Sequence, residues 1–178
     1  MTSELENSLL IADPSLRDGL FDRSVIHLAE HSLQHGAIGY ILNKPTDKKV
    51  GDVLTAPMFT PLKNIPIFFG GPVNTDQIVF SVYWWKDDDH FEYRLRISAE
   101  EAATMKRSPG SILVAHVGHS GWSPGQLEEE LKEQAWINTP VSSHTLSVPH
   151  RELWRSVLEG ISPYHKLLSL TPIEIENN

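Results

Sequence analysis

The sequence predicts an α+β domain with one mixed sheet and flanking helices, and three observations support this class. Runs rich in β-branched and aromatic residues dominate the first half of the chain, whereas helical patterns alternate with strands in the second half. Apolar residues make up 40% of the chain, which is enough for an ordinary core. Because a chain of 178 residues encloses one core, we expect a single domain over residues 1–178, with an ordered part over about 8–170.

The composition excludes several classes of function. The chain has no cysteine, which removes disulfides, thiolate nucleophiles, cysteine-ligated zinc and iron–sulfur clusters. Its net charge is -8, with 23 acidic and 15 basic residues, and the basic residues are scattered, so we expect no autonomous binding to nucleic acid. No apolar run is long enough to span a bilayer, and the first residues are acidic and polar. We therefore expect a cytoplasmic protein without a membrane segment.

Seven strands are expected from apolar and β-branched runs, at Ser8–Ala12, Ser24–Glu30, Ala37–Asn43, Ile65–Phe69, Gln77–Trp85, Phe91–Ile97 and Ser111–Val117. The second and third runs flank a loop that contains Gly36, and the fifth and sixth flank the charged turn Lys86–His90. Each of these pairs is expected to form a hairpin. The three aspartates of the charged turn are interpreted as a solvated loop tip rather than as a cation site.

Four helical segments are expected, at Gly51–Leu54, from Ser98 to about Arg107, from Ser123 to about Ala135 and from about Pro149 to Gly160. The third has the clearest start, because Ser123, Pro124 and Gln126 fit the N-cap, N1 and N3 positions of a capping box. Gly118–Trp122 is interpreted as a tight turn between the last strand and this helix. Thr171–Asn178 is interpreted as a polar tail.

Several turn motifs follow one another along the chain, namely Arg23-Ser24-Val25-Ile26, Glu30-His31, Gly36-Ala37-Ile38-Gly39 with Asn43-Lys44-Pro45, Phe69-Gly70-Gly71-Pro72-Val73, and Gly121-Trp122 with Gly125-Gln126-Leu127-Glu128 and Ala135-Trp136. Together they resemble the AlgH/YqgE family of bacterial proteins over about Leu9 to Leu158. The resemblance implies a single AlgH-like domain whose sheet curls into a partly closed pseudo-barrel, in a cytosolic bacterial protein. Members are often labelled transcriptional regulators, although no helix-turn-helix or basic stripe is visible here. Many members carry a cysteine at the position of Ala29, so a thiol role does not apply to this chain. Many also carry a proline at the position of Gly19.

Gly118-His119-Ser120-Gly121 is similar to the nucleophile elbow of α/β-hydrolases, in which a strand leads through G-x-S-x-G into a helix. The fifth position is Trp122 instead of glycine, and the expected helix begins later than directly behind the serine. No aspartate follows Ser120, so a triad would need a glutamate together with one of the histidines near the end of the chain. A serine hydrolase that uses Ser120 is therefore an alternative hypothesis, and no catalytic residue is assigned.

The same turn has an anion-binding interpretation, because glycines before a helix expose backbone N–H groups at the positive end of the helix dipole. The competing interpretation is a structural turn that allows close packing. Polar or glycine-rich turns at other strand ends are further candidates, and the charge of Arg23 needs a partner such as Asp18 or Asp22. The candidate ligand-binding residues are Arg23, Asn43, Gly70, Gly71, Gly118, Gly121, Trp122 and Gln126.

The histidines do not predict a metal site. His27, His31 and His35 have the spacing of a helical zinc site, but the segment is predicted as a strand, in which the first two stand roughly 13 Å apart. We therefore expect no metal and no cofactor. His116 and His119 are expected as core or rim residues.

The sequence favours a non-enzymatic binding or regulatory domain, which acts through a protein partner or an anionic small molecule near the Gly118–Gly125 turn. Adjacent Trp84 and Trp85 should point to opposite faces of a strand, so one of them is expected to be exposed on a contact surface for a partner or for a second copy of the chain. Direct DNA binding is a further alternative, which the net charge disfavours.

Overall fold

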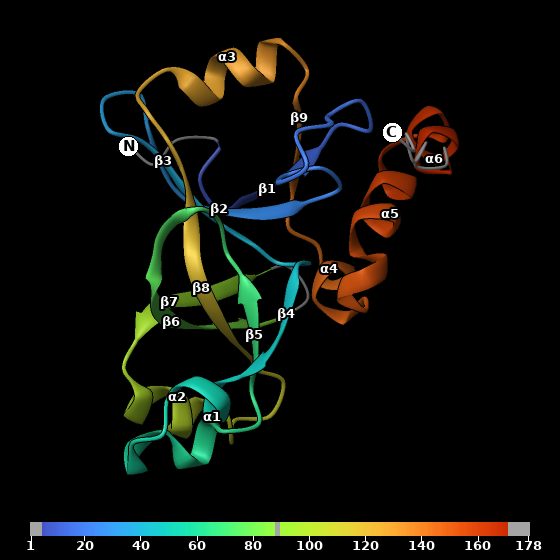
Figure 1. Cartoon of the computed structure of the whole chain (residues 1–178). Helices are drawn as coiled ribbons and strands as arrows, with labels where there is room; N and C mark the ends of the chain where they lie inside the picture. Colours follow the sequence, from blue (N-terminus) through green and yellow to red (C-terminus); the bar gives the residue numbers. More distant parts are fainter. Residues whose placement is uncertain (1–4, 88–89, 171–178) are drawn as a thin grey trace, which may run out of the picture.

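The computed structural model describes residues 5–87 and 90–170, and these form one large mixed sheet flanked by helices (Figure 1). The strands are β1 (Ser8–Ala12), β2 (Val25–Ser32), β3 (Gly36–Ile41), β4 (Pro45–Lys49), β5 (Pro66–Phe69), β6 (Val73–Trp85), β7 (Phe91–Ile97), β8 (Ile112–Trp122) and β9 (Trp136–Pro140). The helices are α1 (Val50–Val53), the 3-10 helix η1 (Pro57–Leu62), α2 (Ala99–Met105), α3 (Gln126–Lys132), α4 (Ser143–Ser147), α5 (His150–Ile161) and α6 (Pro163–Ser169).

The sheet confirms the predicted α+β class. Its strands follow the order β4-β5-β8-β3-β2-β1-β9, and β6 pairs with both β7 and β8 outside this path. The β5–β8 pair is parallel and the other pairs are antiparallel. Over the described residues this sheet is not closed into a barrel. Both predicted hairpins, β2–β3 and β6–β7, are confirmed.

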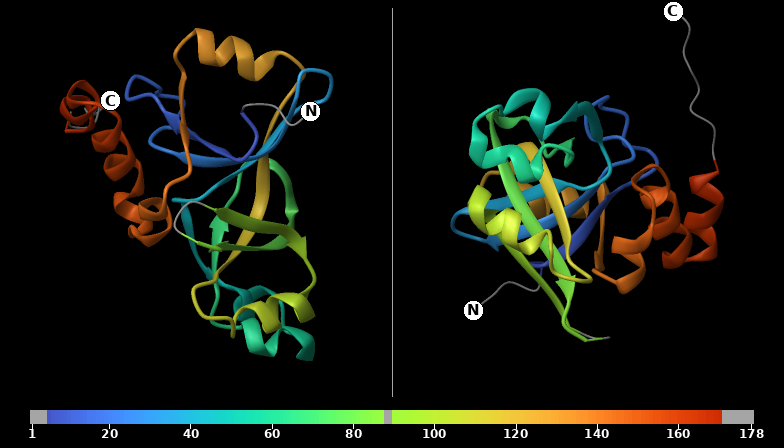
Figure 2. Two further views of the ribbon diagram at one scale, coloured as in Figure 1. Left: turned by 180° about the vertical axis from the view of Figure 1, so that it is seen from behind. Right: turned by 90° about the horizontal axis from the view of Figure 1, so that it is seen from below.

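Strand β8 joins the two halves of the sheet. Its first part pairs with β6 and β5, and its last three residues, 120–122, pair with β3 (Figures 1 and 2). The part of the chain predicted as a tight turn, Gly118–Trp122, therefore lies inside a strand, and that prediction is wrong. The glycines of this segment allow neighbouring backbones to approach β8 closely.

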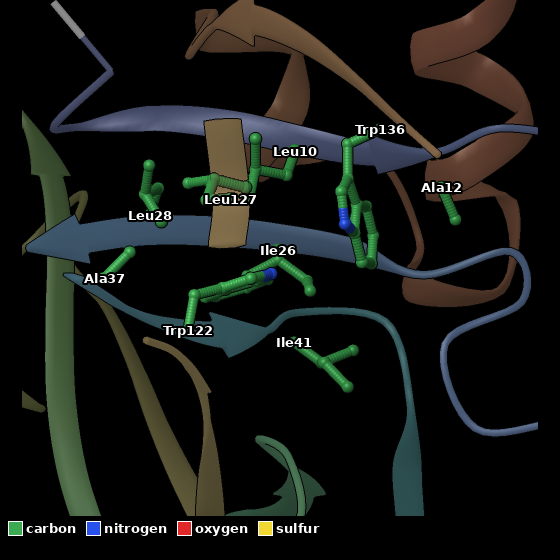
Figure 3. Packing of buried hydrophobic residues seen from close by; sticks show 9 residues of the cluster. All are labelled: Leu10, Ala12, Ile26, Leu28, Ala37, Ile41, Trp122, Leu127 and Trp136. Carbon is green, nitrogen blue, oxygen red and sulfur yellow. The ribbon is translucent and has the colours of Figure 1, made fainter. Parts of the chain in front are cut away.

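Strand β1 is buried on both faces, which explains why its sequence is a continuous apolar run. Leu10 and Ala12 face the cluster under α3, which also contains Trp122 and Trp136 (Figure 3). Leu9 and Ile11 face the opposite way and pack against α5 with Trp154 and Leu158, among others. A third cluster lies between α1, η1 and α2 and the strands β5, β6 and β8. The core thus has three parts, one for each group of helices.

Helix α2 begins as predicted, because the hydroxyl of Ser98 accepts a hydrogen bond from the backbone N–H of Glu101. Helix α3 differs from its prediction. Its N-cap is Gly125 with φ 80°, and the backbone N–H of Ser123 donates to the side chain of Gln126, which is half of the expected capping box. The helix also ends at Lys132. The chain then enters β9, a strand that the helical pattern up to Ala135 concealed.

Four further elements were not predicted, namely β4, η1, α4 and α6. Each is short, and short segments carry too few residues to display a period. Trp84 and Trp85 are both partly buried, so the prediction of one exposed tryptophan is wrong. Asp88, Asp89 and the predicted tail Thr171–Asn178 lie outside the described residues. Within the described part of the chain, no helix combines the length and apolar character needed to cross a bilayer.

Candidate functional site

Ser120 does not stand at a nucleophile elbow. It is fully buried in β8, and its hydroxyl donates a hydrogen bond of 3.0 Å to the carbonyl oxygen of Gly70. An elbow requires the serine to protrude at a turn between strand and helix, whereas α3 begins only at Gln126. The elbow interpretation is therefore wrong, and the hydroxyl ties β8 to the turn that follows β5.

Three of the predicted glycines meet at a crossing of two backbones. Gly70 donates its N–H to the carbonyl of Val117 at 2.9 Å. A Cβ atom on Gly70 would lie 2.3 Å from the carbonyl oxygen of Gly118, and one on Gly118 would lie 2.2 Å from that of Gly71. Such distances leave no room for a side chain, so these glycines carry a packing role. Gly121 differs, because its Cβ would make an ordinary contact of 3.6 Å with Val73.

The side chain of Asn43 holds the neighbouring loop through two hydrogen bonds to its backbone. Its amide oxygen accepts from the backbone N–H of Val25 at 2.8 Å, and its amide nitrogen donates to the carbonyl of Arg23 at 2.8 Å. These two bonds hold Arg23 at a left-handed φ of 54°. The guanidinium of Arg23 lies 5.2 Å from the ring centroid of Trp154, while Asp18 accepts from three backbone N–H groups of its own loop. Asn43 thus positions Arg23, which lines a cavity between β9 and α6.

Trp122 and Gln126 converge on Glu130 of α3. The carboxylate accepts from the indole N–H groups of Trp122 and Trp136 at 2.8 and 2.7 Å, and from the amide of Gln126 at 2.8 Å. The two indoles meet edge to face, with centroids 6.0 Å apart. Since one carboxylate satisfies two buried tryptophans, it fixes α3 over the sheet. Sequence reasoning gave no role to Glu130.

We expect Glu130→Ala to lower the free energy of unfolding by roughly 1–3 kcal/mol, because it leaves two indole donors without their acceptor. Glu130→Gln keeps one acceptor oxygen and should cost less. Glu129→Ala is the matched control on the same helix, because Glu129 is exposed and surface changes usually stay within about 0.5 kcal/mol. Denaturant unfolding followed by tryptophan fluorescence measures all three. Equal losses for the variants of Glu129 and Glu130 would contradict the bridging role.

Gly118 also lines a polar pocket of about 250 Å³ with six other residues, Tyr40, Asn74, Gln77, Val79, Arg96 and His119. They come from four strands, β3, β6, β7 and β8. Two irregularities open this pocket. The register of β6 against β8 shifts between Val73 and Ile78, and the register of β6 against β7 shifts between Phe80 and Val82. Asn74 and Arg96 adopt left-handed φ values of 53° and 54°. Such bulges are common beside functional sites, where they redirect side chains.

Arg96 is the permanently charged cation of this pocket. Its Nε donates to the hydroxyl of Tyr40 at 3.2 Å, and its guanidinium lies 3.9 Å from the Glu30 carboxylate. Burial, and then the charge of Arg96, hold the pKa of His119 below its ordinary value, while Glu30 acts in the opposite direction. His119 is therefore mostly neutral at pH 7, and Arg96 supplies the positive charge. Sequence reasoning found Gly118 and the rim position of His119 but missed Tyr40 and Arg96, because bulges leave no signal in an alternating strand.

Two histidines are buried in the interior rather than exposed to a ligand. The ring of His27 packs edge to face against Tyr83, Phe91 and Tyr93, and burial lowers its pKa to about 3, with a smaller contribution from His116. The Nε2 of His116 lies 3.0 Å from the carbonyl of Ile41. Burial lowers the pKa of His116 to about 4, although this hydrogen bond acts in the opposite direction. Both are thus neutral core histidines.

His31 faces α3, where its Nε2 lies 2.6 Å from the carboxylate of Glu128. Among the described residues, no three potential ligands are grouped as a metal site would need.

The predicted site residues lie in separate groups. Arg23 and Asn43 form one, the glycine crossing with Gly118 forms another, and Trp122 with Gln126 forms a third.

Comparison with known proteins gives consistent matches over nearly the whole chain. A family model described as AlgH-like matches residues 9–165. A UPF0301 protein of Vibrio cholerae is 33% identical, covering 89% of this chain and 94% of that protein, and one of Shewanella sp. is 35% identical, covering 84% and 87%. The solution structure of the AlgH protein from Pseudomonas aeruginosa matches with a TM-score of 0.67 and 26% identity, covering 97% of both chains. A crystal structure from Corynebacterium diphtheriae matches with a TM-score of 0.74 and 25% identity, covering 96% of this chain and 95% of that one.

Proposed function

This chain belongs to the AlgH-like family, and we propose that it is a non-enzymatic binding domain for a small anion, held between Arg96, His119 and the backbone at Gly118. The proposal keeps the ligand class that the sequence suggested but moves the site from the start of α3 to the strands below it. The first turn of α3 carries Glu128 and Glu129, whose charges would repel an anion there. We further propose that the protein works in the cytoplasm, as the resemblance implies.

The observation that carries the proposal is the convergence of the Arg96 guanidinium and the half-buried His119 imidazole on one polar pocket. Guanidinium groups bind carboxylate and phosphate oxygens through parallel N–H donors. The amides of Asn74 and Gln77 line the same pocket and add neutral donors. A volume of about 250 Å³ is smaller than the usual range for drug-sized ligands, so it fits one phosphate or small carboxylate group.

The ligand would compete with Glu30, whose carboxylate lies at 3.9 Å from Arg96 on the exposed side. The Glu30 carboxylate is too far from Arg96 for a hydrogen bond, whereas an oxyanion of the ligand within the pocket would accept hydrogen bonds from the guanidinium. An anion beside His119 also favours the imidazolium form, so binding should raise the pKa of His119. Proton uptake and anion binding are thus coupled in this pocket.

We expect inorganic phosphate, phosphosugars or small dicarboxylates at millimolar concentrations to raise the melting temperature, since a ligand that binds only the folded state stabilises it. Arg96→Gln should weaken binding at least about tenfold, because a hydrogen bond to a charged group contributes about 1.5–3 kcal/mol. Arg94→Gln is the matched control, because Arg94 lies on the same strand and pairs with Glu101 at 2.7 Å. Glu30→Gln should bind more tightly.

Titration calorimetry gives the affinities, and NMR titration of the His119 ring gives the shift of its pKa. Equal affinity in the variants of Arg94 and Arg96, or no thermal shift with any of these probes, would overturn the proposal. Direct DNA binding, the other regulatory hypothesis, predicts instead an affinity for duplex DNA that falls steeply with salt.

A further inference from the structure

A separate pocket shares the irregular part of β6 with the Arg96 pocket but none of its lining residues. Asn74 and Gln77 line the Arg96 pocket, whereas Thr75 and Asp76 line a second cavity of about 270 Å³. Residues of β4, α1, β5 and β8 complete this cavity, and Figure 1 shows β4 and α1 beside β5. From its lining we propose that the second cavity binds a small zwitterion with an apolar side chain, which is the chemistry of an aliphatic amino acid.

Two irregular strands open this cavity. Strands β5 and β8 lie side by side, with β4 on the outer side of β5 and β6 on the outer side of β8. In β4, residues 46–48 stand opposite the single residue Ile67 of β5. In β6, the register against β8 shifts between Val73 and Ile78. Because a bulge bends its strand and redirects the side chains, both outer strands leave room over the β5–β8 pair.

The floor and one end of the cavity are apolar and accessible. Ile78 and Val117 pack against the core cluster beside α1 and α2 but remain only partly buried, so their side chains also reach the cavity. Leu54 is likewise partly buried, and Val53 is 46% exposed. An aliphatic side chain in this space would remove apolar surface from water on both partners. The volume lies just below the range of about 300–1,000 Å³ that is usual for ligand pockets, which suits a ligand of the size of one amino acid.

One cation and one anion stand on opposite sides of this apolar floor. Lys48 belongs to β4 and Asp76 to β6, and since neighbouring strands are about 4.8 Å apart, these two strands are roughly 14 Å apart. Both side chains are exposed, and neither has a hydrogen-bond or ion-pair partner within the described part of the chain. The flexible stem of Lys48 spans part of the gap. A ligand carboxylate can therefore pair with Lys48 while the ligand ammonium group pairs with Asp76.

The two charges together select the ligand. Lys48 and Asp76 are the charged residues among those that line the cavity. A simple anion would pair with Lys48 but would also face the carboxylate of Asp76, and a simple cation would meet the reverse arrangement. A zwitterion pairs with both groups. The Arg96 pocket, by contrast, has a permanently charged cation, so the two pockets differ in the class of ligand that they favour.

L-Leucine and its analogues separate the contributions of the two charges and the side chain. 4-Methylpentanoate lacks the ammonium group, isopentylamine lacks the carboxylate, and glycine lacks the side chain. We expect L-leucine to bind about threefold to tenfold more tightly than either singly charged analogue, because ion pairs at an exposed rim are partly screened by water. Glycine should bind at least about tenfold more weakly than L-leucine, since it buries no apolar side chain. NMR titration of the methyl signals of Ile78 and Val117 measures the affinities and reports where the probe binds.

Lys48→Gln and Asp76→Asn should each weaken the binding of L-leucine about threefold to tenfold. Lys63→Gln and Asp47→Asn are the matched controls, because both positions are exposed and lie outside the lining, and they should leave the affinity unchanged. Arg96→Gln should also leave it unchanged, which separates this result from that of the Arg96 pocket. An unchanged affinity in Lys48→Gln or Asp76→Asn, equal binding of L-leucine and any of the three analogues, or no binding of L-leucine at millimolar concentrations would overturn the proposal.

Discussion

Gly118→Ala is expected to lower the free energy of unfolding by about 3 kcal/mol or more, whereas Gly121→Ala, three residues away in the same motif, should change it by less than about 1 kcal/mol. Gly118 has a φ of 69°, which costs an L-residue roughly 1–2 kcal/mol. Its Cβ would also lie 2.2 Å from the carbonyl oxygen of Gly71. Backbone atoms cannot rotate away, so the strands must separate.

Urea denaturation of the purified variants measures this difference, and the slope of the transition reports whether the native state has loosened. Gly125→Ala is a useful control for conformation alone, because Gly125 has a φ of 80° but nothing lies within 4 Å of its Cβ. It should cost about 1 kcal/mol. If Gly118→Ala were as mild as Gly125→Ala, the backbone crossing would not be the reason for glycine at position 118.

Acidification is expected to destabilise the protein steeply between about pH 6.5 and pH 5, because His27 and His116 remain neutral in the core. In the unfolded chain both titrate near 6.5, whereas in the folded protein their pKa values are about 3 and about 4. A folded pKa below the unfolded one means that the unfolded state binds more protons as the pH falls, so stability falls with it. At pH 5 the two residues together should remove about 4 kcal/mol relative to pH 8.

His27→Phe tests this assignment, since it keeps an aromatic ring among Tyr83, Phe91 and Tyr93 but cannot bind a proton. The slope of unfolding free energy against pH should fall by up to about 1.4 kcal/mol per pH unit in this window. Leu28→Ala, a buried neighbour that does not titrate, should lower stability at every pH without changing the slope. A His27→Phe protein with the original slope would show that the acid sensitivity arises elsewhere.

Most strands of this fold could be predicted, because their apolar runs and turn signals lie in contiguous sequence. The apolar run of β1 and the hairpin signals of β2–β3 and β6–β7 are properties of contiguous sequence. The end of β8 could not be predicted in the same way. Gly118-His119-Ser120-Gly121-Trp122 has the composition of a turn, and its pairing with β3 and β6 keeps it in the sheet. Local propensity favoured the turn, and tertiary pairing outweighed it.

The candidate site was less predictable than the fold. Gly118 was found because glycine is conspicuous, but the side chains around it come from strands distant in sequence, Tyr40 from β3 and Arg96 from β7. Arg96 reaches Tyr40 because a bulge places an extra residue in β7 opposite β6. Asn43 could be recognised as a turn residue, and its contact with the carbonyl of Arg23 shows which turn it holds.

The sequence by itself determined the class of the fold, the family and the absence of cysteine chemistry, because composition, period and motif order are all read along one chain. Tertiary structure alone decided what Gly118 to Trp122 do. In sequence they look like a loop that offers a nucleophile or binds an anion at a helix, and in space they form the end of a strand crossed closely by a second backbone. The physical reason is that a glycine's role depends on what approaches it, and those neighbours lie almost fifty residues away in the chain.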